Sequence, residues 1–168
     1  MTKPAVRSIS VRVADLAAAQ GTDVQLQTVG LGSCVAIVLH DAAANVGGMA
    51  HVLLPSLAQT RDRTNPAKVA ETAVPALVAE MRALGAGDPS RYTARLIGGA
   101  SMFGSLLAGG GGINIGERNA IAAREALRAA GIRVVAEDVG GEHGRSVYLH
   151  CSDGRVRVRS LRMGDREL

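Results

Sequence analysis

The sequence predicts an α/β (α+β) sandwich of mixed, mainly antiparallel strands with two main helices. Short apolar segments recur between glycine-rich turns, which indicates about eight strands. Two longer segments carry apolar residues at helical spacing. The 168 residues include 21 glycines but one Phe, two Tyr and no Trp, so the core must be aliphatic. This length and composition favour one domain over residues 1–168.

Four strands are expected in the N-terminal part of the chain. Gln20-Gly21 closes the first, which alternates only in part, and Pro55 ends the fourth. Asn45-Val46-Gly47-Gly48 has turn chemistry and is expected to join the third and fourth strands in a hairpin. The four predicted ranges are Val6–Leu16, Val24–Val29, Cys34–His40 and Met49–Leu54.

The remaining elements include both helices. The first is expected over Pro66–Leu84, after a polar loop, with Pro75 kinking it or marking a fresh start. The second, Glu117–Ala130, stops at Gly131. Two further strands are predicted over Ala94–Ile97 and Ile132–Glu137, and Leu106–Gly112 is predicted to be a glycine-rich loop. A hairpin is predicted at the end, with strands Ser146–Cys151 and Arg155–Ser160 joined by the turn Ser152-Asp153-Gly154.

The net charge of +4 is spread over the chain. Its densest run, Arg155–Arg162, alternates with apolar residues, which is typical of one wet face of a strand. Without aromatic stacking partners it does not indicate a nucleic-acid track, although a basic surface would steer an acidic protein partner. We also find no signal peptide and no apolar run of about 20 residues. The expectation is a cytoplasmic protein without membrane insertion, whose thiols are reduced.

A cysteine nucleophile is the main chemical hypothesis. Cys34 ends the glycine-rich turn Thr28-Val-Gly-Leu-Gly-Ser-Cys34, where backbone N–H groups can approach a thiol and form an oxyanion hole. His51 on a neighbouring strand could deprotonate that thiol, and the Thr28 hydroxyl could orient the histidine. The alternatives are a small buried cysteine and an ordinary strand threonine.

The sequence leaves open whether His51 lies on the same face as Cys34. A hairpin that turns about Asn45–Gly47 pairs His51 near Ile37, which places it on the opposite face from a Cys34 in regular strand geometry. Either a bulge in the Ala42–Gly48 connection or a departure of Cys34 from the alternation would bring the two together.

Other candidate sites are rejected. His40, His143 and His150 have no ligand spacing with a cysteine or carboxylate, so no metal site is expected, and Cys151 is interpreted as structural. The glycines of Gly30-Leu31-Gly32 and Gly109–Gly112 lack the helix and the Lys-Ser or Lys-Thr of phosphate-binding loops. No cofactor is therefore predicted.

Several short motifs, in this order and spacing, closely resemble CheD, the family of chemoreceptor glutamine deamidases. The resemblance extends from about Val24 to Leu161. The motifs are Thr28–Cys34, Gly48-Met-Ala-His-Val-Leu-Leu-Pro55, Gly98-Gly-Ala-Ser-Met-Phe103, Ile115-Gly-Glu-Arg-Asn119, Asp138-Val-Gly-Gly141 and Gly144-Arg145.

The resemblance implies hydrolysis of selected glutamine side chains on the cytoplasmic helices of chemotaxis receptors. It implies a sandwich similar to the catalytic fold of glutamine-deamidating toxins, and a Cys-His-Thr triad that falls on Cys34, His51 and Thr28. A CheC-type phosphatase is an implied second partner. Substrate-binding or oxyanion roles are expected for Gly32, Ser33, Gly99 and Ser101.

The chain departs from many relatives at Val69 and Glu71, where Tyr and Asp are common, and at Asp153-Gly154, where Thr-Gly is commoner. None of these touches the triad, so they bear on partner choice. Two other classes are weighed: a binding module that docks on a phosphatase or receptor, and another cysteine enzyme such as a transglutaminase or amidase.

Overall fold

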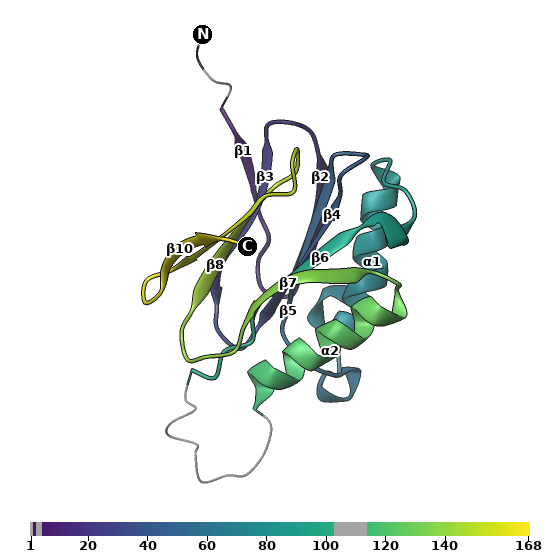
Figure 1. The fold of residues 1–168 in the computed structure, drawn as a ribbon. Helices are drawn as coiled ribbons and strands as arrows, with labels where there is room; N and C mark the ends of the chain where they lie inside the picture. The colour runs from purple at the N-terminus through teal and green to yellow at the C-terminus, as the bar shows by residue number, and fades with distance from the viewer. Residues whose placement is uncertain (1, 3–4, 103–113) are drawn as a thin grey trace.

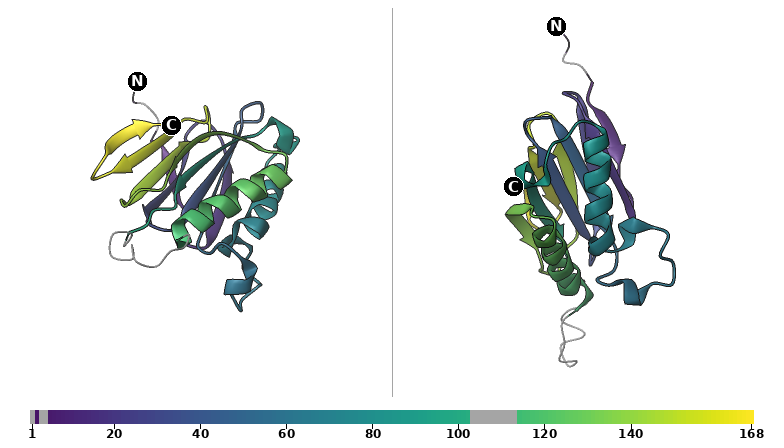
Figure 2. Two further views of the ribbon diagram at one scale, coloured as in Figure 1. Left: turned by 60° about the horizontal axis from the view of Figure 1, so that its bottom comes forward. Right: turned by 90° about the vertical axis from the view of Figure 1, so that its right-hand side faces the viewer.

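The computed structural model describes residue 2, residues 5–102 and residues 114–168, which form two sheets and two α-helices in three layers. Strands β1, β3, β8, β9 and β10 form the outer sheet, in that order. Strands β2, β5, β4, β6 and β7 form the central sheet. The outer sheet packs on one face of the central sheet, and both helices cover the other face (Figures 1 and 2). The predicted α+β sandwich is confirmed.

The outer sheet is antiparallel except where β1 runs parallel to β3. A register shift interrupts the pairing of β3 with β8 between Thr28 and Leu31, which is where the glycine-rich turn begins. The strands are β1 (Arg7–Ser10), β3 (Val24–Leu31), β8 (Arg145–His150), β9 (Val156–Ser160) and β10 (Gly164–Glu167).

The central sheet has β4 in its middle, and every residue of β4 is buried. This follows from burial on both faces, because one face meets the outer sheet and the other meets the helices. The strands are β2 (Asp15–Gln20), β4 (Val35–Asp41), β5 (Val46–Val52), β6 (Thr93–Gly98) and β7 (Arg133–Val139), and only the β6–β7 pair is parallel.

The helices are close to those predicted. Helix α1 (Ala70–Ala83) continues through Pro75, and the fresh start lies earlier, where the 3₁₀ turn Pro66–Lys68 ends at an extended Val69. Helix α2 spans Ile115–Ala129, and the Oδ1 of its N-cap residue, Asn114, accepts a hydrogen bond from the N–H of Glu117. Two further 3₁₀ turns are Leu57–Gln59 and Pro89–Arg91.

The structure differs from the predicted strands and turns in three places. The range Val6–Leu16 is not one strand: it splits at Ala14, whose φ is 57°, so that β1 and β2 enter different sheets. Strand β10 was not predicted, because all four of its residues are exposed and it carries no apolar alternation. Finally, Val46, Gly47 and Gly48 belong to β5 rather than to the preceding turn.

Gly47 and Gly48 lie in β5 where both neighbouring layers pack closely against the strand. A Cβ on Gly47 would lie 2.9 Å from the Cys151 sulfur, in the outer-sheet layer. A Cβ on Gly48 would lie 2.8 Å from the Met81 sulfur, on the helix side. These glycines therefore allow close packing on both faces. The turn is instead Ala42–Asn45, and Asn45 adopts the left-handed conformation, with φ of 53°.

None of the helices in the described residues is long and apolar enough to cross a membrane.

Candidate active site

Thr28 and His51 meet between the two sheets. Thr28 lies on β3 and His51 on β5, and the two side chains are 2 % and 1 % exposed. The Thr28 Oγ1 is 2.7 Å from the His51 Nδ1 and 2.6 Å from the carbonyl oxygen of Val11. The predicted contact between these two side chains is therefore present in the structure.

The hydrogen bonds of Thr28 fix the tautomer of His51. A carbonyl oxygen only accepts, so the single hydroxyl proton of Thr28 is donated to Val11. The Thr28 oxygen must then accept from the Nδ1–H of His51. This leaves the Nε2 of His51 unprotonated, and no described residue makes a hydrogen bond to it. His51 is therefore presented as a base at Nε2.

Cys34 lies on the same face of the central sheet as His51. In the β4–β5 hairpin His51 pairs with Ala36 rather than with Ile37, and Cys34 is two residues before Ala36. Side chains on a strand alternate between its two faces, so a register shift of one residue would place His51 on the opposite face from Cys34. The Ala42–Asn45 turn sets that register, and with it His51 lies on the same face of the central sheet as Cys34.

No hydrogen bond joins the Cys34 thiol to His51 in this resting structure. Diagonal neighbours on one face of an antiparallel pair nevertheless lie within reach of longer side chains. Catalytic hydrogen bonds are often long without substrate and shorten in the substrate complex.

Burial favours the neutral forms of both groups. It lowers the pKa of His51 to about 4. It also raises the pKa of the Cys34 thiol, although the cysteine's own backbone N–H, which faces the sulfur, opposes that rise. Only 9 % of Cys34 is exposed, so the thiol is largely enclosed. The resting site therefore holds a thiol and a neutral imidazole.

The low pKa of His51 predicts acid sensitivity of the fold. Between its unfolded pKa of 6.5 and its folded pKa of about 4, the unfolded chain binds a proton that the folded chain does not. The free energy of unfolding should therefore fall as the pH drops through this window, by about 2–3 kcal/mol at pH 4.5. Urea unfolding at pH 7 and pH 4.5 measures this loss. The variant His51→Gln should lose correspondingly less, and an equal loss in both proteins would contradict the assignment.

A glycine turn after β6 holds the backbone of Cys34. The N–H of Gly99 donates to the Cys34 carbonyl at 2.8 Å, and the N–H of Ala100 donates to the Gly32 carbonyl at 2.9 Å. A Cβ on Gly98, whose φ is 112°, would collide with the Cys34 carbonyl oxygen. Close backbone approach explains both glycines, and the N–H of Gly99 is already bonded to the cysteine.

The buried Arg145 supports the same turn. Its guanidinium lies 3.2 Å from the Asp138 carboxylate and 3.4 Å from the Gly98 carbonyl oxygen. Arg145 therefore connects the motifs Asp138–Gly141 and Gly144-Arg145 to the Gly98 turn, which holds the Cys34 backbone.

The remaining predicted substrate or oxyanion residues surround this turn. Gly32 and Ser33 directly precede the cysteine, and the side chain of Met102 packs over Gly32. Gly99 and Ser101 line a cavity of about 340 Å³ that also includes Gly140 and Gly141. Phe103 and the predicted loop Leu106–Gly112 lie outside the described residues.

Asn119 is a polar residue of the site that reasoning from individual residues missed. It lies on α2, is 1 % exposed, and its Nδ2 donates to the carbonyl oxygens of Ser33 and Leu53. The only signal in the sequence was its place in the motif Ile115–Asn119.

The other histidines and the second cysteine lie elsewhere. The Nε2 of His40 is 2.9 Å from the Cys151 carbonyl oxygen. Cys151 is fully buried in the core between the sheets, and burial raises its pKa to about 11. Among the described residues, no three His, Cys, Asp or Glu side chains are grouped so that they could hold a metal ion.

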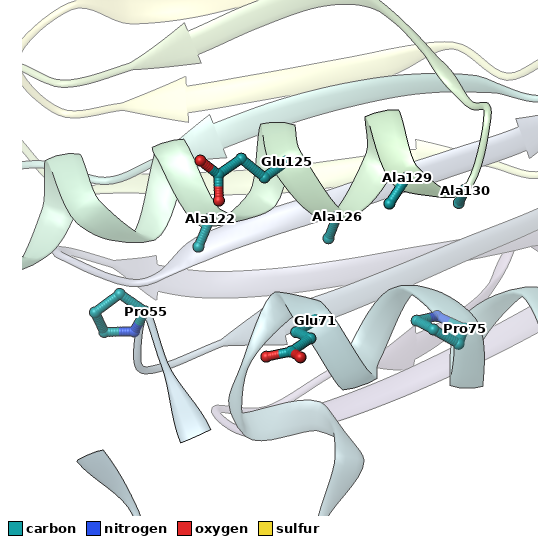
Figure 3. Close-up of a pocket in the computed structure, with 8 residues that line it drawn as sticks. All are labelled: Pro55, Glu71, Pro75, Ala122, Glu125, Ala126, Ala129 and Ala130. Carbon is teal, nitrogen blue, oxygen red and sulfur yellow. The ribbon is translucent and has the colours of Figure 1, made fainter. Parts of the chain in front are cut away.

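A separate groove of about 330 Å³ lies between α1 and α2 (Figure 3). Glu71, one of the departures from the resembled family, lines this groove, whereas Val69, another departure, is buried and bridges to Leu54. The lining residues are Pro55, Glu71, Pro75, Ala122, Glu125, Ala126, Ala129 and Ala130. None of the triad residues is among them.

Sequence comparison with known proteins places this chain in a family. Residues 53–160 match the family model described as CheD chemotactic sensory transduction. A relative from Desulforamulus reducens, named probable chemoreceptor glutamine deamidase CheD, is 43% identical over 91% of this chain and 90% of its own length. A Pyrococcus horikoshii protein of the same name is 42% identical over 95% of this chain and 96% of its own.

A solved structure supports the fold. The chain matches a Neisseria meningitidis protein of the DUF152 family with a TM-score of 0.54 and 12% sequence identity. The match covers 82% of this chain and 65% of that protein, so the chain spans slightly less than two thirds of its length.

Proposed function

The chain belongs to the CheD family, and from this premise we propose that it is a chemoreceptor glutamine deamidase with a cysteine nucleophile. The substrate class is the side-chain amide of glutamines on chemotaxis receptors, and the products are glutamate and ammonia. We propose that residues 1–168 act as one deamidase domain without a cofactor. Cys34 is assigned as nucleophile, His51 as general base and acid, and Thr28 as the residue that orients His51.

The observation that carries this proposal is the hydrogen-bond chain from Val11 through Thr28 to His51. It directs an unprotonated Nε2 into the face that Cys34 shares. A base on a shared face with a thiol, oriented by a third group, is the arrangement that activates a cysteine. The two neutral resting forms favour proton transfer during attack over a preformed ion pair.

In the first half of the reaction the Cys34 sulfur attacks the glutamine Cδ, and the thiol proton passes to the His51 Nε2. The amide oxygen becomes an oxyanion, for which the Cys34 N–H is the proposed donor. The tetrahedral intermediate then collapses, the C–N bond breaks, and His51 returns the proton to the leaving nitrogen. Ammonia departs and a thioester remains on Cys34.

In the second half, water attacks the thioester carbon while the His51 Nε2 accepts a proton from it. The C–S bond breaks, and the proton on His51 returns to the Cys34 sulfur. Glutamate is released and the thiol is regenerated, so every proton is accounted for.

Intact-mass analysis of a purified receptor fragment tests the proposal. Each conversion of a glutamine amide to a carboxyl group adds about one dalton, and one ammonia is released when the thioester forms. Incubation with an added primary amine distinguishes a transglutaminase, which would add the mass of the amine instead. A fragment whose mass does not change would overturn the proposed activity.

Replacement of Thr28 should affect catalysis through His51. Thr28→Val leaves the Nδ1–H of His51 and the Val11 carbonyl without a partner, so the ring loses its fixed orientation. We expect kcat to fall about 10–100-fold, comparable to the loss of an orienting partner elsewhere. Thr28→Ser keeps the hydroxyl and should retain most of the activity. Equal activity of the two variants in an ammonia-release assay would contradict this role.

Partners and location follow from the proposed activity. Receptor glutamines of this kind lie on cytoplasmic helices, so we propose a cytoplasmic location. A CheC-type phosphatase is proposed as a second partner, by family membership alone. The alternative, a binding module without catalysis, requires that the wild-type protein binds receptor or phosphatase but releases no ammonia. Measuring binding and ammonia release on the same sample separates the two.

A further inference from the structure

Asn119 connects the cysteine loop to the end of the histidine strand. Its Nδ2 donates to the Ser33 carbonyl at 2.9 Å and to the Leu53 carbonyl at 3.1 Å. Ser33 precedes Cys34, and Leu53 follows the last residue of β5, two positions after His51. One amide group on α2 therefore ties together the two segments that carry the proposed nucleophile and base.

The orientation of this amide is fixed by its surroundings. If the amide were reversed, its oxygen would face two carbonyl oxygens, which cannot donate. In the observed orientation the Oδ1 is buried and has no hydrogen-bond partner among the described residues. An unpaired buried carbonyl destabilises the fold, so Asn119 is not explained by stability alone. Its two donated hydrogen bonds are what distinguish it from an apolar residue of the same size.

The hydrogen bond to Ser33 also sets the direction of the next N–H group. In a trans peptide the C=O of one residue and the N–H of the following residue point in opposite directions. Asn119 holds the Ser33 C=O toward α2, so the Cys34 N–H points away from α2. That N–H faces the Cys34 sulfur, where it favours the thiolate. On the other side of the cysteine, the Gly99 N–H holds the Cys34 carbonyl, so both flanking peptides are fixed.

We propose that Asn119 is a positioning residue that orients the Ser33–Cys34 peptide so that the Cys34 N–H meets the oxyanion forming on the substrate amide. This inference rests on the proposed deamidase function and deepens it. The amide of Asn119 itself does not touch the substrate. Its effect is exerted in the transition state, because a misdirected N–H binds the ground-state carbonyl about as well but stabilises the oxyanion less.

The test compares Asn119→Leu and the isosteric Asn119→Asp with wild type. Both variants remove the two donated hydrogen bonds, and making both keeps the test valid if one fails to fold. Leu127→Ala is the matched control, because it removes a buried core side chain of the same helix without touching Ser33 or Leu53. For each protein, kcat and KM on a receptor fragment are measured with the active fraction set by titrating Cys34 with a thiol reagent, and Tm is recorded.

We expect kcat of the Asn119 variants to fall about 10–100-fold with KM within about threefold of wild type, since an oxyanion donor acts in the transition state. Leu127→Ala should lower Tm but keep kcat. A folded Asn119 variant with wild-type kcat, or an equal loss of kcat in Leu127→Ala, would overturn the positioning role while the deamidase activity stands. A wild-type protein that deamidates no receptor fragment would overturn the proposed function, and this inference with it.

Discussion

Cys34→Ala should abolish ammonia release from a receptor fragment, with a loss of about 10⁴-fold or more in kcat. The thioester intermediate cannot form without this thiol. The fold should persist, because Cys34 lies at the end of the core and removal of one buried sulfur costs about 1–2 kcal/mol. Ammonia release and a thermal melt of the same preparation measure both effects.

Cys151→Ala is the matched control for this prediction. Cys151 is fully buried against Gly47 and its pKa is raised to about 11, so it should react slowly with iodoacetamide and its loss should cost only stability. Cys34, which is 9 % exposed where Cys151 is fully buried and whose own N–H faces the sulfur, should be the faster thiol. Deamidation by Cys34→Ala, or loss of activity in Cys151→Ala with a normal melt, would refute the assignment of the nucleophile.

His51→Gln should lower kcat by about 10²–10⁴-fold at neutral pH, the usual contribution of a general base. The glutamine amide can still bond to Thr28, which limits the structural change. Without a base, the reaction depends on free ionisation of Cys34, whose pKa is raised by burial. The rate of the variant should therefore increase about tenfold per pH unit up to the thiol pKa. The wild-type rate should decline only toward the pKa of His51, about 4.

His40→Gln provides the control for a buried histidine of the same sheet. His40 lies at the far end of β4, pairs with Gly47, and bonds to the Cys151 carbonyl. Its replacement should change stability but leave the rate and its pH dependence close to wild type. If the rates and pH profiles of His51→Gln and wild type coincide, His51 is not the base.

Much of the fold could be predicted from the sequence, because the signals are local. Apolar periodicity located both helices and most strands, and Gly131 marked the end of α2. The elements that escaped lack such signals. Strand β10 is exposed at every position, and the break at Ala14 depends on β1 and β2 joining different sheets. Neither feature is encoded in the hydrophobic pattern of a single segment.

The site divides in the same way. The sequence by itself determined the side chains proposed to react: a thiol after a glycine turn, a histidine in the next hairpin strand and a hydroxyl before them. Only the tertiary structure decided that Cys34 and His51 share a face of the central sheet. Gly47 and Gly48 have no Cβ to collide with Cys151 and Met81, so both can lie inside β5 between the packed layers. The turn is then Ala42–Asn45, and His51 pairs with Ala36.

The contacts that set the chemistry are also tertiary. The Val11 carbonyl that fixes the tautomer of His51 comes from the segment between β1 and β2, and Asn119 comes from a helix on the opposite side of the central sheet. A hydrogen bond between residues far apart in sequence leaves no periodicity in either segment. The sequence therefore determines which groups are available to react, and the packing of the layers determines which atom of each group faces the reaction.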